Sequence, residues 1–213
     1  MLTIHHLGKS QSERIVWLCE ELGIPYDLKR YERDGRTMLA PADYRALHAL
    51  GAAPVITDGD VVLAESAAIV EYVIARHGGG RLAMGPDAPG YADFLYWFHF
   101  VNGTLQPALG RRMVLTLASV ADDNRMILAT TARIRLALGS IEERLAGNPF
   151  LAGDDLTAAD IMMVFTLTTM RYFAPFDLSP YPAILTYLRR IADRPAYRAA
   201  MAKGDPGMTL LLD

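Results

Sequence analysis

Two pairs of neighbouring residues bring together functional groups that could hold a charged small molecule. Glu65 and Ser66 come directly before the apolar stripe of a helix, so they place a carboxylate, a hydroxyl and free backbone N–H groups at the positive end of the helix dipole. Such a pair can bind an ammonium and a carboxylate of one ligand. Ser10 and Ser12 stand in the same way before the first helix, where a hydroxyl can donate a hydrogen bond to an anion.

The hydrophobic pattern of the first part of the chain predicts the elements that position these residues. Residues 2–7 form an apolar run typical of a strand, and from Ser12 the apolar residues follow a helical period that Gly23 ends. Residues 26–31 predict a second strand. A strand, a helix and a strand in this order form a crossover that pairs the two strands in parallel.

The next segment predicts a hairpin followed by a helix. Two apolar runs between Pro54 and Ala64 are joined by Asp58-Gly59, a strong signal for a hairpin turn. Ser66 is a candidate N-cap for a helix that ends near Gly78. The order β-α-β followed by β-β-α predicts an α/β unit with one mixed, four-stranded sheet.

The remainder of the chain predicts helices only. Residues 79–89 are rich in glycine and proline and form a linker. The first helical stretch, from Tyr91 to Ala118, contains Gly103 and Pro107 and is expected to kink or split. Further helices are expected to end at Gly147, to begin at the Thr157-x-x-Asp160 capping pattern, and to cover residues 182–191 and 195–203.

Composition excludes several classes of function. Lys and Arg number 21 against 24 Asp and Glu, a net charge of −3, which disfavours nucleic acid and anionic membranes as partners. Cys19 is the single cysteine and falls on an apolar stripe, so we expect a buried, inert thiol and a cytoplasmic, reducing location. No signal peptide and no membrane-spanning apolar run is visible. The five histidines lack a ligand spacing, so we expect no metal.

Several local phrases follow this order of elements. They are Ser10-Gln11-Ser12-Glu13-Arg14, Trp17 to Gly23, Ala53-Pro54-Val55 and Leu63 to Ile69. With this order and spacing, essentially the whole chain resembles the cytosolic glutathione transferases, in particular serine-type, bacterial-like ones. The resemblance implies a thioredoxin-like domain at residues 1–78 that binds glutathione. It also implies an all-helical domain at residues 90–213 that holds a hydrophobic electrophile.

For catalysis, the resemblance implies a hydroxyl that stabilises the glutathione thiolate. Ser10 matches the serine of the serine-type enzymes, four residues before Arg14, and Ser12 is the alternative. Neither would be a nucleophile, because the attacking atom is the glutathione sulfur. Residues 10–13 occupy the place of a Cys-x-x-Cys pair and contain no cysteine, which argues against disulfide exchange.

For binding, the resemblance implies a cis peptide bond between Ala53 and Pro54. That bond turns the backbone N–H and C=O of Ala53 outward to pair with the cysteinyl residue of glutathione, as an added strand would. The resemblance further implies that Glu65 pairs with the ammonium of the γ-glutamyl group and that Ser66 binds its carboxylate. The residues expected to contact the electrophile are Leu7, Phe100 and Leu105.

One position departs from the family pattern. Many relatives carry Lys or Gln two residues before the cis proline, where the side chain contacts the glycyl carboxylate of glutathione, and this chain carries Ala52. Lys9 or His48 could replace that contact. Without a replacement, the loss of one charge-assisted hydrogen bond costs about 1.5–3 kcal/mol, which weakens binding of glutathione.

The sequence therefore predicts a glutathione S-transferase with a role in detoxification. It would conjugate glutathione, its co-substrate, to a hydrophobic electrophile, work as a cytoplasmic homodimer, and use no metal. One alternative is a non-catalytic glutathione- or ligand-binding regulatory protein of the same fold, which Ala52 favours. Another is a glutathione-dependent peroxidase, which the lack of a cysteine at the first helix start disfavours.

Overall fold

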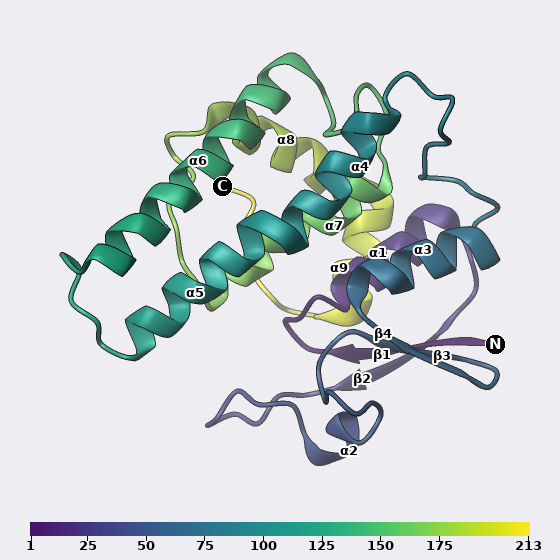
Figure 1. Cartoon of the computed structure of the whole chain (residues 1–213). Coiled ribbons are helices and arrows are strands. Elements are labelled where there is room, and N and C mark those ends of the chain that lie inside the picture. Colours follow the sequence, from purple (N-terminus) through teal and green to yellow (C-terminus); the bar gives the residue numbers. More distant parts are fainter. The chain divides into compact units, whose positions relative to one another are not determined.

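The computed structural model describes residues 1–213 and divides the chain into two compact units. The first unit contains Met1–Ala83 and Ala192–Leu210, and the second contains Met84–Ile191 and Leu211–Asp213. The first unit holds the mixed sheet and the second is helical, as predicted (Figure 1). The domain limits 1–78 and 90–213 stay a prediction, although the last helix clusters with the first unit rather than with the other helices.

The sheet of the first unit has four strands in the order β2-β1-β3-β4. Strand β1 (Leu2–Leu7) pairs in parallel with β2 (Asp27–Tyr31), which confirms the predicted crossover. Strand β3 (Val55–Asp58) pairs antiparallel with β1 and with β4 (Val61–Ala64). The hairpin turn lies one residue later than predicted, because Asp58 still pairs with Val61.

Three helices flank this sheet. Helix α1 (Glu13–Leu22) ends at Gly23, whose left-handed φ of 63° closes the helix as the sequence predicts. Helices α1 and α3 (Ser66–Arg76) lie against one face of the sheet, and the short α2 (Ala42–Arg45) lies on the other face (Figure 1). Cys19 on α1 is fully buried, and burial raises the pKa of its thiol to about 12, so the thiol stays protonated at neutral pH.

The strand period sends neighbouring residues of β1 to opposite faces. Leu7 lies on the α2 face, where it packs with Tyr31, Tyr44 and Val55. His6 lies on the α1 face and reaches the C-terminal end of α9. Two adjacent residues of one strand therefore serve two separate side-chain clusters.

Helix α9 (Pro195–Gly204) packs against α1 inside the first unit. The rings of Trp17 and Tyr197 meet edge to face with centroids 5.1 Å apart, and the guanidinium of Arg194 donates to both carboxylate oxygens of Glu21 at 2.6 and 2.7 Å. The sequence predicts this helix but not its partner, because the pattern of a short amphipathic helix does not indicate which other element covers its apolar face.

The second unit begins with a long helical segment that changes its winding in the middle. Helix α4 (Tyr91–Phe100) continues into a π-helical turn, η1 (Val101–Leu105), and then into α5 (Gln106–Leu117). The interruption contains Gly103 and ends next to Pro107, which lies in the first turn of α5, where its missing N–H is tolerated. This confirms the predicted split.

The rest of the second unit consists of helices that the sequence largely predicts. Helix α6 (Arg125–Gly147) packs against α5, and α8 (Pro182–Ala192) is the last helix of the unit. A 3-10 turn, η2 (Thr169–Tyr172), follows α7 (Ala158–Leu167) and was not predicted. No helix of the chain is both long and apolar enough to cross a membrane.

A capping box starts α7, as the Thr-x-x-Asp pattern predicts. Asp160 is fully buried, and its carboxylate accepts from the backbone N–H of Thr157 at 2.9 Å and of Leu151 at 3.0 Å. It also accepts from the hydroxyl of Tyr187 on α8 at 3.1 Å. Asp160 therefore joins the start of α7 to the preceding loop and to α8.

We expect Asp160→Ala to lower the free energy of unfolding by about 2–4 kcal/mol, because it removes the cap and leaves several buried donors without an acceptor. Thr157→Ala, which removes only the side-chain part of the cap, should cost about 1 kcal/mol. Chemical denaturation of both variants measures the two values. A smaller loss for Asp160→Ala than for Thr157→Ala would contradict this role.

Candidate functional site

A cavity of about 140 Å³ lies in the first unit, between the turn that precedes α1 and the start of α3. It brings together four residues that the sequence singles out as ligand contacts, although they come from two separate segments of the chain. The cavity is lined by Gln11, Leu50, Ala52, Ala53, Pro54, Ala64, Glu65 and Ser66.

One wall of the cavity is exposed backbone. The peptide bond between Ala53 and Pro54 is cis, as the family resemblance implies. The backbone N–H and C=O of Ala53 form no hydrogen bond within the chain, directly before β3 begins. A short extended peptide can pair with these two groups in the manner of an added strand.

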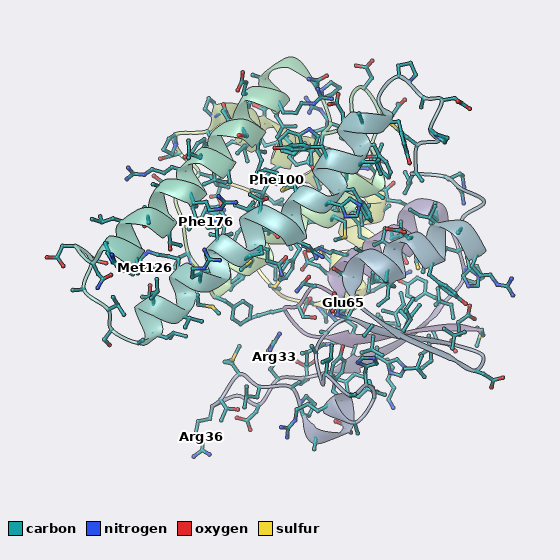
Figure 2. All side chains as sticks on the ribbon, in the orientation of Figure 1. Arg33, Arg36, Glu65, Phe100, Met126 and Phe176 are labelled. Atoms are coloured by element: carbon teal, nitrogen blue, oxygen red, sulfur yellow. The ribbon has the colours of Figure 1, made fainter.

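The opposite wall is the start of α3. Glu65 occupies the N-cap position with φ 71°, a left-handed conformation that non-glycine residues adopt at a cost of order 1–3 kcal/mol and that recurs at ligand sites. Its exposed carboxylate makes no hydrogen bond within the chain, and Figure 2 shows it at the junction of β4 and α3. The N–H groups of Ala67 and Ala68 have no carbonyl partner in the helix, so this end favours an anion.

The predicted capping role of Ser66 is wrong, because Glu65 takes the N-cap position and Ser66 is the first helical residue. The Ser66 hydroxyl is buried and accepts a hydrogen bond from Arg14 at 3.0 Å. The prediction failed because the left-handed turn at Glu65 moves the helix start by one residue, and a glutamate in that conformation has no sequence signal.

Arg14 provides a buried positive charge behind the cavity. Its guanidinium is fully buried in α1 and donates to two cavity residues, Gln11 at 2.5 Å and Ser66 at 3.0 Å. Burial lowers the pKa of Arg14 to about 9, so the group keeps its charge at neutral pH. Gln11 lines the cavity but was not predicted as a ligand contact from the sequence. Its place between two serines before a helix start was the available signal.

Ser10 and Ser12 lie together at the turn from β1 into α1 but do not line this cavity. Their hydroxyl oxygens are 2.8 Å apart, with 4% of Ser10 and none of Ser12 exposed. Ser12 does not cap α1 with its side chain; its hydroxyl turns back to β1 and accepts from the N–H of Leu7 at 3.2 Å. Ser12 thus has its partners inside the protein, and Ser10 is the more accessible hydroxyl.

The three residues expected to contact the electrophile lie in the packed interior of their own units. Leu7 belongs to the cluster on the α2 face of the sheet. Phe100, labelled in Figure 2, packs its ring against those of Tyr96 and Trp97, with centroids 5.5 and 5.1 Å away. Leu105 is fully buried in η1. Their contact with an electrophile stays a prediction.

A larger and more apolar cavity lies within the second unit. It has a volume of about 490 Å³ and is enclosed by α5, α6 and the segment that leads into α8. Phe176, labelled in Figure 2, belongs to that segment. Its apolar lining includes Leu109, Met113, Ile134, Leu138, Phe173 and Phe176. This lining suits a hydrophobic ligand.

No group of three or more His, Cys, Asp or Glu side chains in the chain could hold a metal ion.

A mixed four-stranded sheet with a cis proline before β3 and a helix that follows β4 defines a thioredoxin-like fold. Comparison with known families agrees. Residues 10–76 match the model of the glutathione S-transferase N-terminal domain, and residues 105–195 match that of the C-terminal domain.

Individual relatives cover the whole chain. Glutathione S-transferase 3 of Schizosaccharomyces pombe is 34% identical over 228 residues, which is 100% of this chain and 92% of that protein. A glutathione S-transferase structure from Actinobacillus pleuropneumoniae is 33% identical, covers 96% of this chain and 93% of its own, and has a TM-score of 0.85. A family member from Pseudomonas fluorescens, solved with two glutathione bound, shares the fold at 19% identity, with 94% and 92% coverage and a TM-score of 0.78. The chain belongs to the glutathione S-transferase family and is a glutathione transferase.

Proposed function

We propose that this protein binds glutathione in the cavity between the cis-proline loop and α3, and presents the thiol as a thiolate to a hydrophobic electrophile. One observation carries the proposal: the free backbone of Ala53, the carboxylate of Glu65 and the hydroxyl of Ser66 surround one cavity. These groups complement the peptide, ammonium and carboxylate of glutathione. The structure from Pseudomonas fluorescens supports the assignment, because a protein of this fold holds glutathione.

The γ-glutamyl end of glutathione suits the charge pattern of the cavity. Its carboxylate would receive hydrogen bonds from Ser66 and from the first N–H groups of α3, with the charge of Arg14 behind them. Its ammonium would pair with Glu65, whose carboxylate faces solvent. The cysteinyl residue would pair with the backbone of Ala53, and its sulfur would lie near the start of α1.

Stabilisation of the thiolate needs only a modest free energy. A free thiol with pKa about 8.5 is roughly 3% ionised at neutral pH, whereas a decrease of about two units makes it roughly 75% thiolate, at about 2.7 kcal/mol. One hydrogen bond to a charged group supplies about 1.5–3 kcal/mol, and the positive end of α1 adds to it. The Ser10 hydroxyl at that helix start is the proposed donor.

The proposed reaction is a nucleophilic substitution or addition at an electrophilic carbon. The thiol proton leaves to solvent, and an electron pair of the sulfur forms the new C–S bond. The leaving group departs with its bonding pair, or the pair moves onto the acceptor. Because the attacking atom belongs to glutathione, the protein contributes position and charge stabilisation rather than a nucleophile.

The apolar lining of the cavity in the helical unit supports a hydrophobic second substrate. Leu7, Phe100 and Leu105 stay proposed contacts, which would require movement of side chains that are buried here. A cytoplasmic location and a homodimer complete the proposal. The single, buried cysteine is consistent with a reducing compartment, and the family resemblance implies the dimer.

The choice of Ser10 over Ser12 is tested by Ser10→Ala and Ser12→Ala with glutathione and a generic aryl halide. We expect Ser10→Ala to lower kcat by roughly 10- to 100-fold, the effect of one hydrogen bond to a charged sulfur, with little change in the KM for glutathione. Ser12→Ala should lower kcat less and reduce thermal stability more, because Ser12 is wholly internal. A larger loss of kcat in a folded Ser12→Ala protein would contradict the assignment.

The departure at Ala52 gives a second test. A lysine at this exposed, cavity-lining position could pair with the glycyl carboxylate of glutathione, so we expect Ala52→Lys to tighten binding by about 10-fold. Ala49→Lys adds the same charge at an exposed position outside the cavity lining and is the matched control. Calorimetry measures both affinities. Equal affinity in Ala52→Lys and the unmodified protein would show that Lys9, His48 or another group already makes this contact.

A further inference from the structure

Four buried side chains form a continuous hydrogen-bonded series that ends at Ser10. The Oδ2 atom of Asp205 lies 3.1 Å from Nε2 of His6, and Nδ1 of His6 lies 2.9 Å from Oγ of Ser12. Oγ of Ser12 lies 2.8 Å from Oγ of Ser10. His6 and Ser12 are completely inaccessible to solvent, and the Asp205 side chain is 8% exposed. The series therefore connects the end of α9 to the turn before α1 without passing through solvent.

The fold brings these four residues together from distant parts of the sequence. The period of β1 places His6 on the face that carries α1 and α9. A Cβ on Gly204 would lie 3.1 Å from the imidazole ring, so a glycine at the end of α9 lets Asp205 approach. The other oxygen of Asp205 accepts from the backbone N–H of Lys9 at 2.9 Å, which fixes the carboxylate.

The hydrogens of the series determine where the Ser10 hydroxyl can donate. If His6 is neutral, its Nε2 hydrogen goes to Asp205 and its Nδ1 accepts from Ser12. The oxygen of Ser12 is then open to accept, and the Ser10 hydroxyl donates inward to it. If His6 is an imidazolium, Nδ1 donates to Ser12, and the Ser12 hydroxyl can donate to Ser10 at 2.8 Å or to the carbonyl of Leu7 at 3.3 Å. When it donates to Ser10, the shorter contact, the Ser10 hydrogen is left to donate outward.

Ser10 also accepts from the backbone N–H of Ser12 at 3.2 Å. When the Ser12 hydroxyl donates to Ser10, the Ser10 oxygen therefore receives two hydrogen bonds, and its own hydrogen has no internal acceptor in the series. A thiolate can only accept a hydrogen bond. The Ser10 hydroxyl can therefore bind it when its hydrogen points outward, and cannot when its hydrogen points inward to Ser12. The direction of the series decides whether Ser10 can stabilise the sulfur.

We propose that His6 and Asp205 are positioning residues that act through Ser12 to turn the Ser10 hydroxyl toward the glutathione sulfur, with Nδ1 of His6 donating to Ser12. The inference rests on the proposed function of Ser10 as the thiolate donor. His6, Ser12 and Asp205 do not touch the substrate in this arrangement.

The surroundings of Asp205 keep its end of the series ionised. Burial raises the pKa of Asp205, but the hydrogen bonds from His6 and from the backbone N–H of Lys9, together with nearby positive charge, hold that pKa below its usual value, so the carboxylate is ionised. Arg30 on β2 lies beside His6 in the sheet register and lowers the pKa of Asp205 further. Arg33, Lys9 and Glu32 bring further charges near Asp205, and the turn before α1 contributes the uncharged Ser12 hydroxyl.

The inference is tested with His6→Gln and Asp205→Asn, which remove the imidazole or the carboxylate of the pair while little volume changes. The matched control is His5→Gln, which removes the neighbouring histidine of β1, on the opposite face of the sheet and bonded to Tyr31 and Thr57. The readout is the ultraviolet absorbance of the thiolate of bound glutathione as a function of pH, together with kcat. S-methylglutathione, which has no ionisable thiol, reports affinity alone.

We expect both variants to raise the pKa of the bound thiol by about one unit and to lower kcat at neutral pH by a similar factor, about 10-fold. Affinity for S-methylglutathione should stay within about twofold, because the positioning residues do not contact the ligand. His5→Gln should match the unmodified protein in all three measurements. Melting curves establish that each variant is folded.

The outcomes separate this inference from the proposed function. An unchanged thiol pKa in the folded variants, beside a raised pKa in Ser10→Ala, would overturn the roles of His6 and Asp205 and leave the function of Ser10 intact. An unmodified protein that binds glutathione without lowering the thiol pKa would overturn the proposed function, and the inference with it. If His6→Gln does not fold, Asp205→Asn decides, since its remaining oxygen can still accept from Lys9.

Discussion

The hydrogen bonds between Ser12 and the end of β1 fix the point at which α1 begins, and the rest of the site is arranged around that point. The Ser12 hydroxyl accepts from the N–H of Leu7 and lies within hydrogen-bond distance of Ser10 and His6. Because these groups are buried, water cannot replace a missing partner. The loss of one of these hydrogen bonds would leave a buried polar group unpaired, at a cost of about 1–3 kcal/mol. The turn therefore holds Ser10 at the positive end of α1, and it holds Arg14 one turn further along, behind the cavity.

The site separates its charges according to their burial. Arg14 is enclosed and keeps its charge despite a pKa lowered to about 9, while Glu65 stays exposed at the rim. A zwitterionic group can place its carboxylate toward the first and its ammonium toward the second. The left-handed turn at Glu65 makes this possible, because it reverses the chain between β4 and α3 and opens the start of the helix to the cavity.

Much of this arrangement follows from local sequence signals. The apolar periods, Gly23, the Thr157 capping pattern and the glycine and proline in the first long helix predict elements that the structure confirms. The grouping of Ala53, Glu65 and Ser66 follows from the order of elements once the family resemblance is recognised.

The features that the sequence did not predict depend on long-range packing. The N-cap of α3 lies at Glu65 rather than at Ser66 because Glu65 adopts a left-handed turn. Helix α9 belongs to the sheet unit, where Tyr197 packs against Trp17. The link between His6 and Asp205 spans 199 positions of the chain and has no local signature. A sequence pattern indicates which face of a segment is buried. These features depend on which other part of the chain covers that face.

The most direct test of the central claim is the number of protons released when glutathione binds. Calorimetric titration at neutral pH, in buffers of different ionisation enthalpy, measures that number. If the site binds glutathione as a thiolate, a decrease of about two units in the thiol pKa should release about 0.7 of a proton per glutathione bound. Binding without proton release, or no binding at millimolar glutathione, would contradict the account.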